Sequence, residues 1–231
     1  MIKRTLFAAA AAAPLLLALP ASAATIVNGS FEDHTCAGAA GSFATIFPGN
    51  ACITGWDVGP HSVDLVGAYW QAHDGIMSVD LGGNAPGSIS QTFATVVGGV
   101  YTVNYWLSGN PDGGDLAKFG LISAINGTTV ASSTFLGIQG SSHANMNYLP
   151  WQFTFTALEA STTLTFAADT SEGAYGPVLD AVSITTAVPE PGTWAMMLLG
   201  FGLIGFGLRK RKANDGMARM RVSFDEAPRL A

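Results

Sequence analysis

The chain has 231 residues, of which 48% are hydrophobic, and its 16 acidic and 10 basic side chains give a formal net charge of −6. The charge is unevenly distributed, because residues 24–187 contain twelve acidic side chains and a single base, Lys118. That segment has no basic patch that could neutralise phosphates, which excludes nucleic acid as a partner. The simplest interpretation of its acidity is solubility.

The first 23 residues have the pattern of a secretory signal peptide. Lys3 and Arg4 form a positively charged start, an apolar run extends from Leu6 to Leu19, and Ala21-Ser22-Ala23 provides a small-residue cleavage site. We therefore expect residues 1–23 to be removed on export and the rest of the chain to fold in an oxidising compartment.

Cys36 and Cys52 are the two cysteines of the chain. In an oxidising compartment we expect them to pair, and a disulfide closing a loop of about 16 residues would stabilise the fold by about 3 kcal/mol. A metal-binding pair and a reactive thiol are the alternative interpretations. The first of these lacks the nearby histidine pair of a zinc site.

Residues 24–187 are predicted to be all-β, because apolar and polar side chains alternate in many short segments. Trp151, Phe153 and Phe155 alternate with polar residues, which places the three rings on one face of a strand. No amphipathic helix of three turns appears before Pro189. Strands are expected at Ile26–Phe31, Ser62–Val66, Ile76–Leu81, Ser88–Ala94, Tyr101–Ser108, Phe119–Ile125, Thr129–Phe135, Trp151–Thr156, Thr163–Ala168 and Val178–Thr185.

Glycine-rich turns separate these expected strands. Asn126-Gly127 is typical of a type I′ hairpin turn, and Gly98-Gly99 marks another turn. About ten short strands joined in this way predict a two-sheet antiparallel sandwich of the jelly-roll type. Residues 24–187 are numerous enough to form one domain with a hydrophobic core, to which we assign Trp56.

Six short motifs follow one another along this domain: Asn28-Gly29-Ser30-Phe31-Glu32, Ile53-Thr54-Gly55-Trp56, Ser78-Val79-Asp80-Leu81-Gly82, Ser88-Ile89-Ser90-Gln91-Thr92, Leu107-Ser108-Gly109-Asn110 and Leu179-Asp180-Ala181-Val182-Ser183. In this order they resemble the choice-of-anchor C family. That family is similar in turn to a plant cell-wall family of unknown function with a galactose-binding-like sandwich. The resemblance implies an extracellular, non-catalytic domain and suggests carbohydrate as its ligand.

The resemblance also suggests a structural Ca²⁺ ion. Galactose-binding-like sandwiches often hold one with a Glu after the opening strand and an Asp in the closing strand, and the matching positions here are Glu32 and Asp180. With backbone carbonyls near Gly29 and water, these carboxylates would supply the roughly six to eight oxygens that Ca²⁺ requires. The alternative interpretation is that Glu32 accepts hydrogen bonds from turn amides and that Asp180 caps a strand.

A glycine-bracketed loop carries the groups that commonly bind sugars, namely rings for apolar C–H faces and polar groups for hydroxyls. The expected ligand-binding residues are Tyr69, Trp70, Gln71, His73 and Asp74, with Tyr148 and Tyr175 as further candidates. The alternative is that Trp70 simply closes one end of the sandwich.

The sequence offers no catalytic motif. Neither a Gly-x-Ser-x-Gly elbow nor a His-Glu-x-x-His helix is present. A glycosidase would need two carboxyl groups roughly 5–10 Å apart, which sequence spacing in a sandwich does not establish. We therefore expect no catalytic residues. The four histidines are scattered in polar, Gly-rich or Ser-rich segments: His34, His61, His73 and His143.

The segment from 188 to 212 has three parts: Val188-Pro189-Glu190-Pro191, an uncharged apolar run at 193–208, and Arg209-Lys210-Arg211-Lys212. As a helix the run would be roughly 24 Å long, against a bilayer core of about 30 Å. Trp194 and the bases at its ends would extend it into a transmembrane helix with its C-terminal side in the cytoplasm. A buried helix of a soluble protein is the alternative interpretation.

The three parts together resemble the PEP-CTERM sorting signal of Gram-negative bacteria. In that family an exosortase, a membrane cysteine peptidase, reads the signal. The resemblance implies an ectodomain anchored to the inner membrane on its periplasmic side and then sorted to the cell surface. Such signals normally end after the basic cluster, whereas here residues 213–231 follow and are expected to be disordered.

The sequence as a whole therefore predicts an exported, exosortase-sorted surface or extracellular-matrix protein. Its domain is expected to bind carbohydrate or exopolysaccharide without catalysis. The alternatives are a purely structural component of a matrix or biofilm and, as a different class, a hydrolase that acts on glycans.

Overall fold

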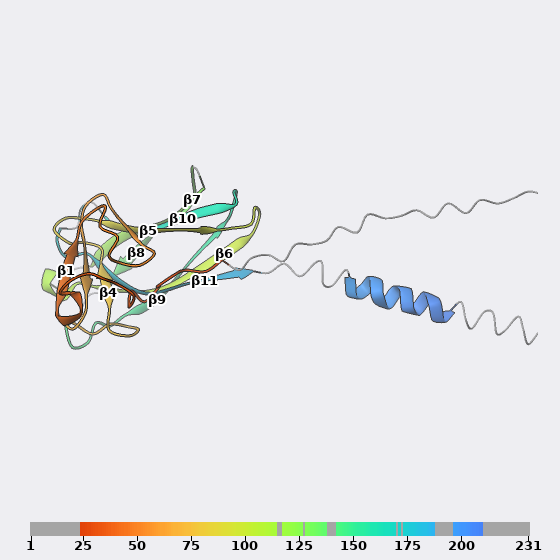
Figure 1. Ribbon diagram of the computed structural model, residues 1–231, viewed down its shortest axis with the longest axis horizontal. Helices are drawn as coiled ribbons and strands as arrows, with labels where there is room; N and C mark the ends of the chain where they lie inside the picture. The colour runs from red at the N-terminus through yellow and green to blue at the C-terminus, as the bar shows by residue number, and fades with distance from the viewer. Residues whose placement is uncertain are drawn as a thin grey trace, which may run out of the picture. The chain divides into compact units, whose positions relative to one another are not determined.

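The computed structural model describes residues 24–114, 117–126, 128–137, 142–169, 171, 173–187 and 196–209. The segment Ala21–Val188 forms one compact unit. Its described residues build two antiparallel sheets that face each other, which confirms the predicted all-β sandwich (Figure 1). The predicted signal peptide, the Pro-Glu-Pro motif, Lys210–Lys212 and the tail at 213–231 lie outside the described residues.

The first sheet has six strands and the second has five. The order in the six-stranded sheet is β1 (Phe43–Ile46), β3 (Val63–Val66), β4 (Ser78–Asp80), β11 (Pro177–Ala187), β6 (Val100–Gly109) and β9 (Leu149–Thr156). The order in the five-stranded sheet is β2 (Asp57–Gly59), β5 (Ser88–Ala94), β10 (Ser161–Ala168), β7 (Lys118–Asn126) and β8 (Thr128–Gly137). Two short 3₁₀ helices also form, η1 (Ala39–Gly41) and η2 (Pro111–Gly113).

The hydrophobic core lies between the sheets and follows the period-two pattern of the strands. Along β6 and β10 every second side chain is buried. The ring of Tyr105 in β6 meets that of Phe166 in β10 edge-on, with centroids 5.1 Å apart, so the two sheets are in direct contact through aromatic groups. Trp56 is 2% exposed and also packs near Phe166, which confirms its assignment to the core.

Most of the predicted strands and the predicted hairpin are present. β7 and β8 pair antiparallel with Asn126 opposite Thr128, as the Asn-Gly turn predicts. The prediction of a strand at Ile26–Phe31 is wrong, and the short strands β1 and β2 were not predicted. Residues 27–31 form bends and turns because Asn28 and Phe31 have positive φ angles of 53° and 64°, which interrupt an extended chain.

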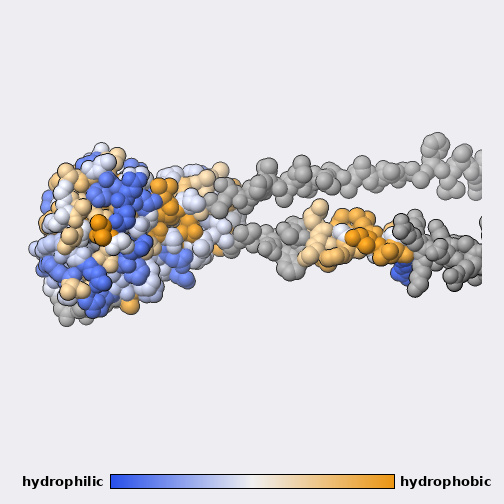
Figure 2. Space-filling model, turned by 60° about the horizontal axis from the view of Figure 1, so that its bottom comes forward, coloured by the Kyte–Doolittle hydropathy of each residue, from blue (hydrophilic) through white to orange (hydrophobic). Residues whose placement is uncertain are grey.

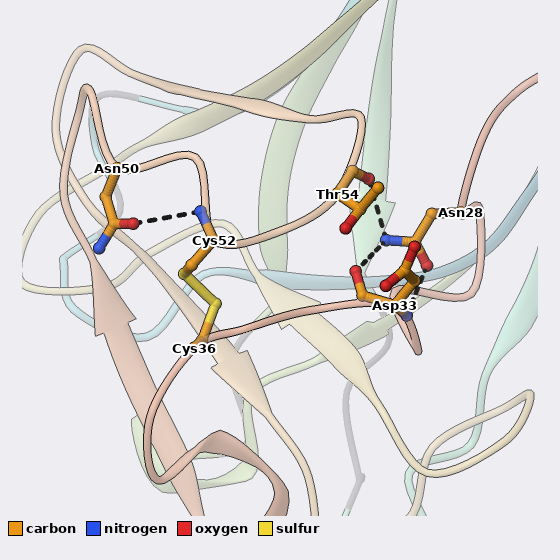
Figure 3. Close-up of a disulfide and its surroundings, with 6 residues drawn as sticks. All are labelled: Asn28, Asp33, Cys36, Asn50, Cys52 and Thr54. Carbon is orange, nitrogen blue, oxygen red and sulfur yellow. Dashed lines mark hydrogen bonds between the residues drawn. A yellow bond between two sulfur atoms is a disulfide. The ribbon is translucent and has the colours of Figure 1, made fainter.

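The opening segment is tied to the rest of the sandwich by side chains instead of a strand ladder. Figure 3 shows the Asn28 amide, which donates to the carbonyl oxygens of Asp33 and Thr54 and accepts from the Asp33 N–H. Beside it, Cys36 and Cys52 form a disulfide, as predicted. The Thr35 N–H donates to the Cys52 carbonyl at 2.8 Å, so the bond joins two segments that already pair.

Residues 196–209 form a helix, and residues 193–195 of the predicted transmembrane run lie outside the described residues. Large apolar side chains dominate its surface (Figure 2). None of the helices in the described part of the chain combines the length and the apolar character needed to cross a membrane. The structure therefore gives the predicted transmembrane helix at 193–208 no support.

The close approach of Gly29 to β11 generates a stability prediction. A Cβ atom at Gly29 would overlap the Val182 carbonyl oxygen. The two backbones are held this close because the Val182 N–H donates to the Gly29 carbonyl at 2.8 Å. We expect Gly29→Ala to lower the free energy of unfolding, measured by urea denaturation, by about 1–3 kcal/mol. Gly41→Ala is the matched control, because a Cβ atom there meets nothing within 4 Å. Equal stability of the two variants would contradict this packing.

Candidate functional site

The outer face of the six-stranded sheet is covered by loops. Leu65, Val79 and Leu179 point into the main core, so their strand neighbours Asp64, Asp80 and Asp180 lie on the opposite face. A second, smaller apolar cluster forms on that face from Val66, Trp70, Met146 and Val178, with Tyr69 and Tyr148 packed against it. Loop residues thus bury part of the sheet that would otherwise face solvent.

Two carboxylates hold the loop at residues 67–77 in place. Asp180 Oδ2 accepts hydrogen bonds from the N–H groups of His73 and Asp74, at 2.7 and 3.0 Å. Glu32 Oε1 accepts from the N–H groups of Ile76 and Met77, both at 2.7 Å. These four bonds fix the loop backbone, and each is strongest when its carboxyl group is ionised.

The five predicted ligand-binding residues of this loop do not converge on one point. Trp70 is 7% exposed, and its indole N–H donates to Ser78 Oγ at 2.9 Å. His73 stacks on Trp106, with ring centroids 3.8 Å apart, while Asp74 and Gln71 are exposed. Tyr69 is half-buried. Trp70 is therefore mainly a packing residue of the smaller cluster, whereas Tyr69 has its ring at the surface.

A cavity of about 300 Å³ lies beside Tyr69 and Trp70. Its walls combine aromatic rings with carboxylate and amide groups. They are formed by Phe43, Asp64, Val66, Tyr69, Trp70, Asn110, Asp112, Ala174 and Tyr175. Phe43 and Tyr175 are 44% and 47% exposed, so their rings are accessible at the rim.

Several of these wall residues were not predicted from sequence. Tyr69, Trp70 and Tyr175 were candidates, but Phe43, Asp64 and Asp112 come from segments that gave no ligand-binding pattern. The fold brings them together, because β1 pairs with β3 and places Phe43 opposite Val66. Another predicted residue, Gln71, lines a separate depression of about 340 Å³ on the other side of Trp70.

A chain of hydrogen bonds fixes the polar wall of the cavity. Asp80 is fully buried, and its carboxylate accepts from the N–H groups of Gly82 and Gly176 and from the Asn110 amide. Asn110 Oδ1 in turn accepts from the Asp112 N–H at 2.8 Å. These bonds set the position of Asn110 and of the Asp112 backbone before any ligand arrives.

Asp112 joins three elements around the cavity mouth. One of its oxygens accepts from the Tyr69 hydroxyl at 2.9 Å, and the other lies 2.8 Å from His143 Nε2. The Tyr69 and His143 rings also touch, with centroids 4.5 Å apart. The Tyr69 ring is therefore held from its hydroxyl end and from one face, which orients it for contact with a ligand.

The carboxyl groups on this face share an apolar environment. Burial raises the pKa of Asp80 to about 7, against three hydrogen bonds that lower it, and the charge of Asp64 raises it further. Asp64 lies directly opposite Asp80 in the β3–β4 register, and burial raises its pKa as well. Burial likewise raises the pKa of Asp180 to about 7. Of these three groups Asp64 lines the cavity, and a shifted pKa in a cleft is typical of functional sites.

The arrangement of Glu32 and Asp180 gives little support to calcium. The groups directed at both carboxylates are backbone N–H donors, whereas Ca²⁺ requires oxygen ligands. The described part of the chain contains no group of three or more His, Cys, Asp or Glu side chains that could hold a metal ion. The donor set does not fit Ca²⁺, and the calcium site stays a prediction from sequence.

Two antiparallel sheets with a walled cavity on one outer face define a β-sandwich domain of the jelly-roll type. Residues 24–185 match the family model described as protein of unknown function (DUF642), and the chain belongs to this family. Residues 187–212 match the PEP-CTERM protein-sorting motif, as predicted. The choice-of-anchor C assignment stays a prediction.

Among curated proteins the chain is similar to halomucin of Haloquadratum walsbyi, with 34% identity over 163 residues. The similarity covers 69% of this chain and 2% of halomucin, so the chain spans a small fraction of that protein.

The chain is also similar to several solved structures, mainly carbohydrate-binding modules. A CBM4 module has a TM-score of 0.40 at 15% identity, with 70% of this chain and 99% of that one covered. A family 35 module from Clostridium thermocellum has a TM-score of 0.43 at 13% identity, with 61% and 97% covered. The arabinose-bound α-L-arabinofuranosidase MgGH51 has a TM-score of 0.48 at 11% identity, with 74% and 27% covered. Neither matching family model describes a catalytic activity.

The buried carboxyl groups predict that stability falls as the pH rises. Asp80 and Asp180 have pKa values of about 7 in the folded chain against an ordinary value of 3.8, so the folded state holds protons that the unfolded state releases. Stability is therefore highest below this window and is lost as the pH rises toward 7. A pKa displaced by one unit is worth about 1.4 kcal/mol, or roughly 3–6 °C in Tm.

We expect Tm to fall by at least that amount between pH 5 and pH 8. His73, whose pKa is lowered by burial, acts in the opposite direction, but its ring is exposed on one side. Calorimetry in about 0.5 M salt separates the buried groups from general repulsion between surface charges, which such salt screens. A Tm that is constant or rises over this range would contradict the assignment.

Proposed function

We propose that the protein is an exported binding protein whose β domain holds carbohydrate in the cavity beside Tyr69, without catalysis. The observation that carries the proposal is the make-up of the cavity wall. The exposed rings of Phe43 and Tyr175 and the half-buried ring of Tyr69 line the same cavity as the polar groups of Asn110 and Asp112. A volume of about 300 Å³ is at the lower end for small-ligand sites.

The chemistry of a sugar ring fits such a wall. Its C–H groups form an apolar face that packs on aromatic rings, and its hydroxyls exchange hydrogen bonds with amides and carboxylates. The Tyr69 ring is already oriented by Asp112 and His143, so little side-chain entropy is lost on binding.

The sorting motif supports the location that we propose for this binding. A PEP-CTERM motif at residues 187–212 supports export and recognition by an exosortase. We propose that the domain is displayed at the cell surface or in the extracellular matrix, where polysaccharide is present. Insertion of the segment around 193–208 into the inner membrane during sorting is part of the proposal.

A purely structural role in the matrix is the second candidate, and it predicts no saturable ligand. The acidic, largely hydrophilic surface of the β domain is compatible with that role as well (Figure 2). The cavity favours binding, because an inert structural domain gains nothing from exposed rings and buried carboxyl groups on one face.

Binding to a polysaccharide array, followed by calorimetry on the retained glycan, tests the proposal. With the purified full chain we expect saturable binding and no turnover of the glycan. Tyr69→Ala and Tyr175→Ala should each weaken it by about tenfold or more, the effect of a binding-site aromatic residue. Tyr69→Phe keeps the ring and should lose less.

Phe119→Ala is the matched control, because Phe119 is 48% exposed on β7 of the other sheet and does not line the cavity. Binding that survives both tyrosine variants, or that is lost in Phe119→Ala, would place the site elsewhere. Absence of any retained glycan would favour the structural role, and release of smaller sugars would indicate a hydrolase.

A further inference from the structure

The charge of the cavity narrows the class of carbohydrate. We infer that the cavity takes a sugar bearing a protonated amine, with the ammonium group bound at Asp64. This inference rests on the proposed function and adds to it the chemical class of the ligand. Four observations carry it: an unpartnered oxygen, the surrounding charge, the aromatic walls and the absence of a metal-binding group among the described residues.

The first observation is the state of the Asp64 carboxyl group. Asp64 lines the cavity, and its Oδ1 atom is buried without any hydrogen-bond partner. Thr45, its cross-strand neighbour on β1, hydrogen-bonds the same carboxyl group. A buried carboxylate oxygen without a hydrogen-bond partner is costly, and a cation in the adjoining cavity would offset that cost by electrostatic attraction.

The second observation is the charge around Asp64. Asp80 lies directly opposite it on β4, and Asp112 lines the same cavity. The Asp80 oxygens already accept from a backbone N–H group and from the Asn110 side chain. One Asp112 oxygen accepts from the Tyr69 hydroxyl, and the other pairs with His143. Asp64 is therefore the one of these three carboxyl groups with an oxygen that accepts no hydrogen bond. Asp64 and Asp112 are both acids of the cavity wall, and together they favour a cation and disfavour a uronic acid.

The nearest base is not part of the cavity wall. A Cβ atom placed on Gly113 would touch both Lys118 Nζ and the Tyr175 side chain, so Lys118 lies close to Tyr175. Lys118 is 5% exposed, has an interaction of its own, and is not among the residues that line the cavity.

The aromatic walls and the size of the cavity favour an organic cation. An ammonium group near the faces of Tyr69 and Tyr175 gains cation–π attraction, and its three N–H donors match the acceptors at hand. A bare metal ion fits less well, because the described residues hold no group of three or more metal-ligating side chains. The cavity is also much larger than an ion and close to the size of a sugar ring.

Calorimetry with three oligosaccharides of equal length tests the inference. The probes are a tetramer of glucosamine, the same tetramer fully N-acetylated, and cellotetraose, each titrated into the purified full chain at about pH 6, where the amines carry charge. We expect the glucosamine tetramer to bind at least about tenfold more tightly than the other two, a difference of about 1.4 kcal/mol.

Asp64→Asn should remove that preference, so that the glucosamine tetramer no longer binds more tightly than the N-acetylated tetramer. Asp57→Asn is the control of equal charge change, because Asp57 is exposed on β2 of the other sheet, and it should keep the preference. A preference that persists in Asp64→Asn would mean that the acidic domain attracts amines non-specifically, which overturns the inference.

The outcomes also separate the inference from the proposed function. Equal affinity of the wild-type chain for all three tetramers, or a preference for a neutral one, overturns the amine and leaves carbohydrate binding intact. Failure to bind these tetramers and every glycan on the array overturns both. The wild-type comparison does not depend on any variant, so a variant that failed to fold would leave the test decisive.

Discussion

The site depends on the hydrogen bonds that two carboxyl groups accept from the backbone of the loop at residues 67–77. Glu32 follows the opening turn, Asp180 belongs to the closing strand β11, and together they accept four backbone N–H groups from His73 to Met77. These bonds keep the preceding part of the loop, with Tyr69 and Trp70, against the outer face of the six-stranded sheet. Both ends of the domain sequence thus meet at the loop that forms the cavity wall.

The same face carries an electrostatic cost that the fold alone does not require. Asp64 and Asp80 sit opposite each other where like charges destabilise a strand pair, and burial disfavours their ionised forms. Three hydrogen bonds compensate Asp80, whereas one oxygen of Asp64 has none. Uncompensated features of this kind are expected where a protein binds something, because a structural role would favour apolar residues there.

The sandwich was predictable from sequence because strand alternation is a local signal. Tyr101 to Leu107 in β6 and Trp151 to Phe155 in β9 show it directly, and both strands formed as expected. β1 and β2 are too short to show a period, and Asn28 at positive φ removed the strand expected in the opening segment. The Tyr69 loop was found by its composition. Phe43, Asp64 and Asp112 were not, because strand pairing alone brings them to the cavity.

The most direct test of the account is hydrogen–deuterium exchange on the full chain with and without a glycan that it retains. If the cavity is the binding site, saturation slows exchange in the segments that contribute its wall residues, which are 64–70, 110–112 and 174–175. Exchange on β7 and β8 of the other sheet should not change. Protection confined to β7 and β8, or no protection in the presence of bound glycan, would contradict the claim that the loop held by Glu32 and Asp180 builds a carbohydrate site.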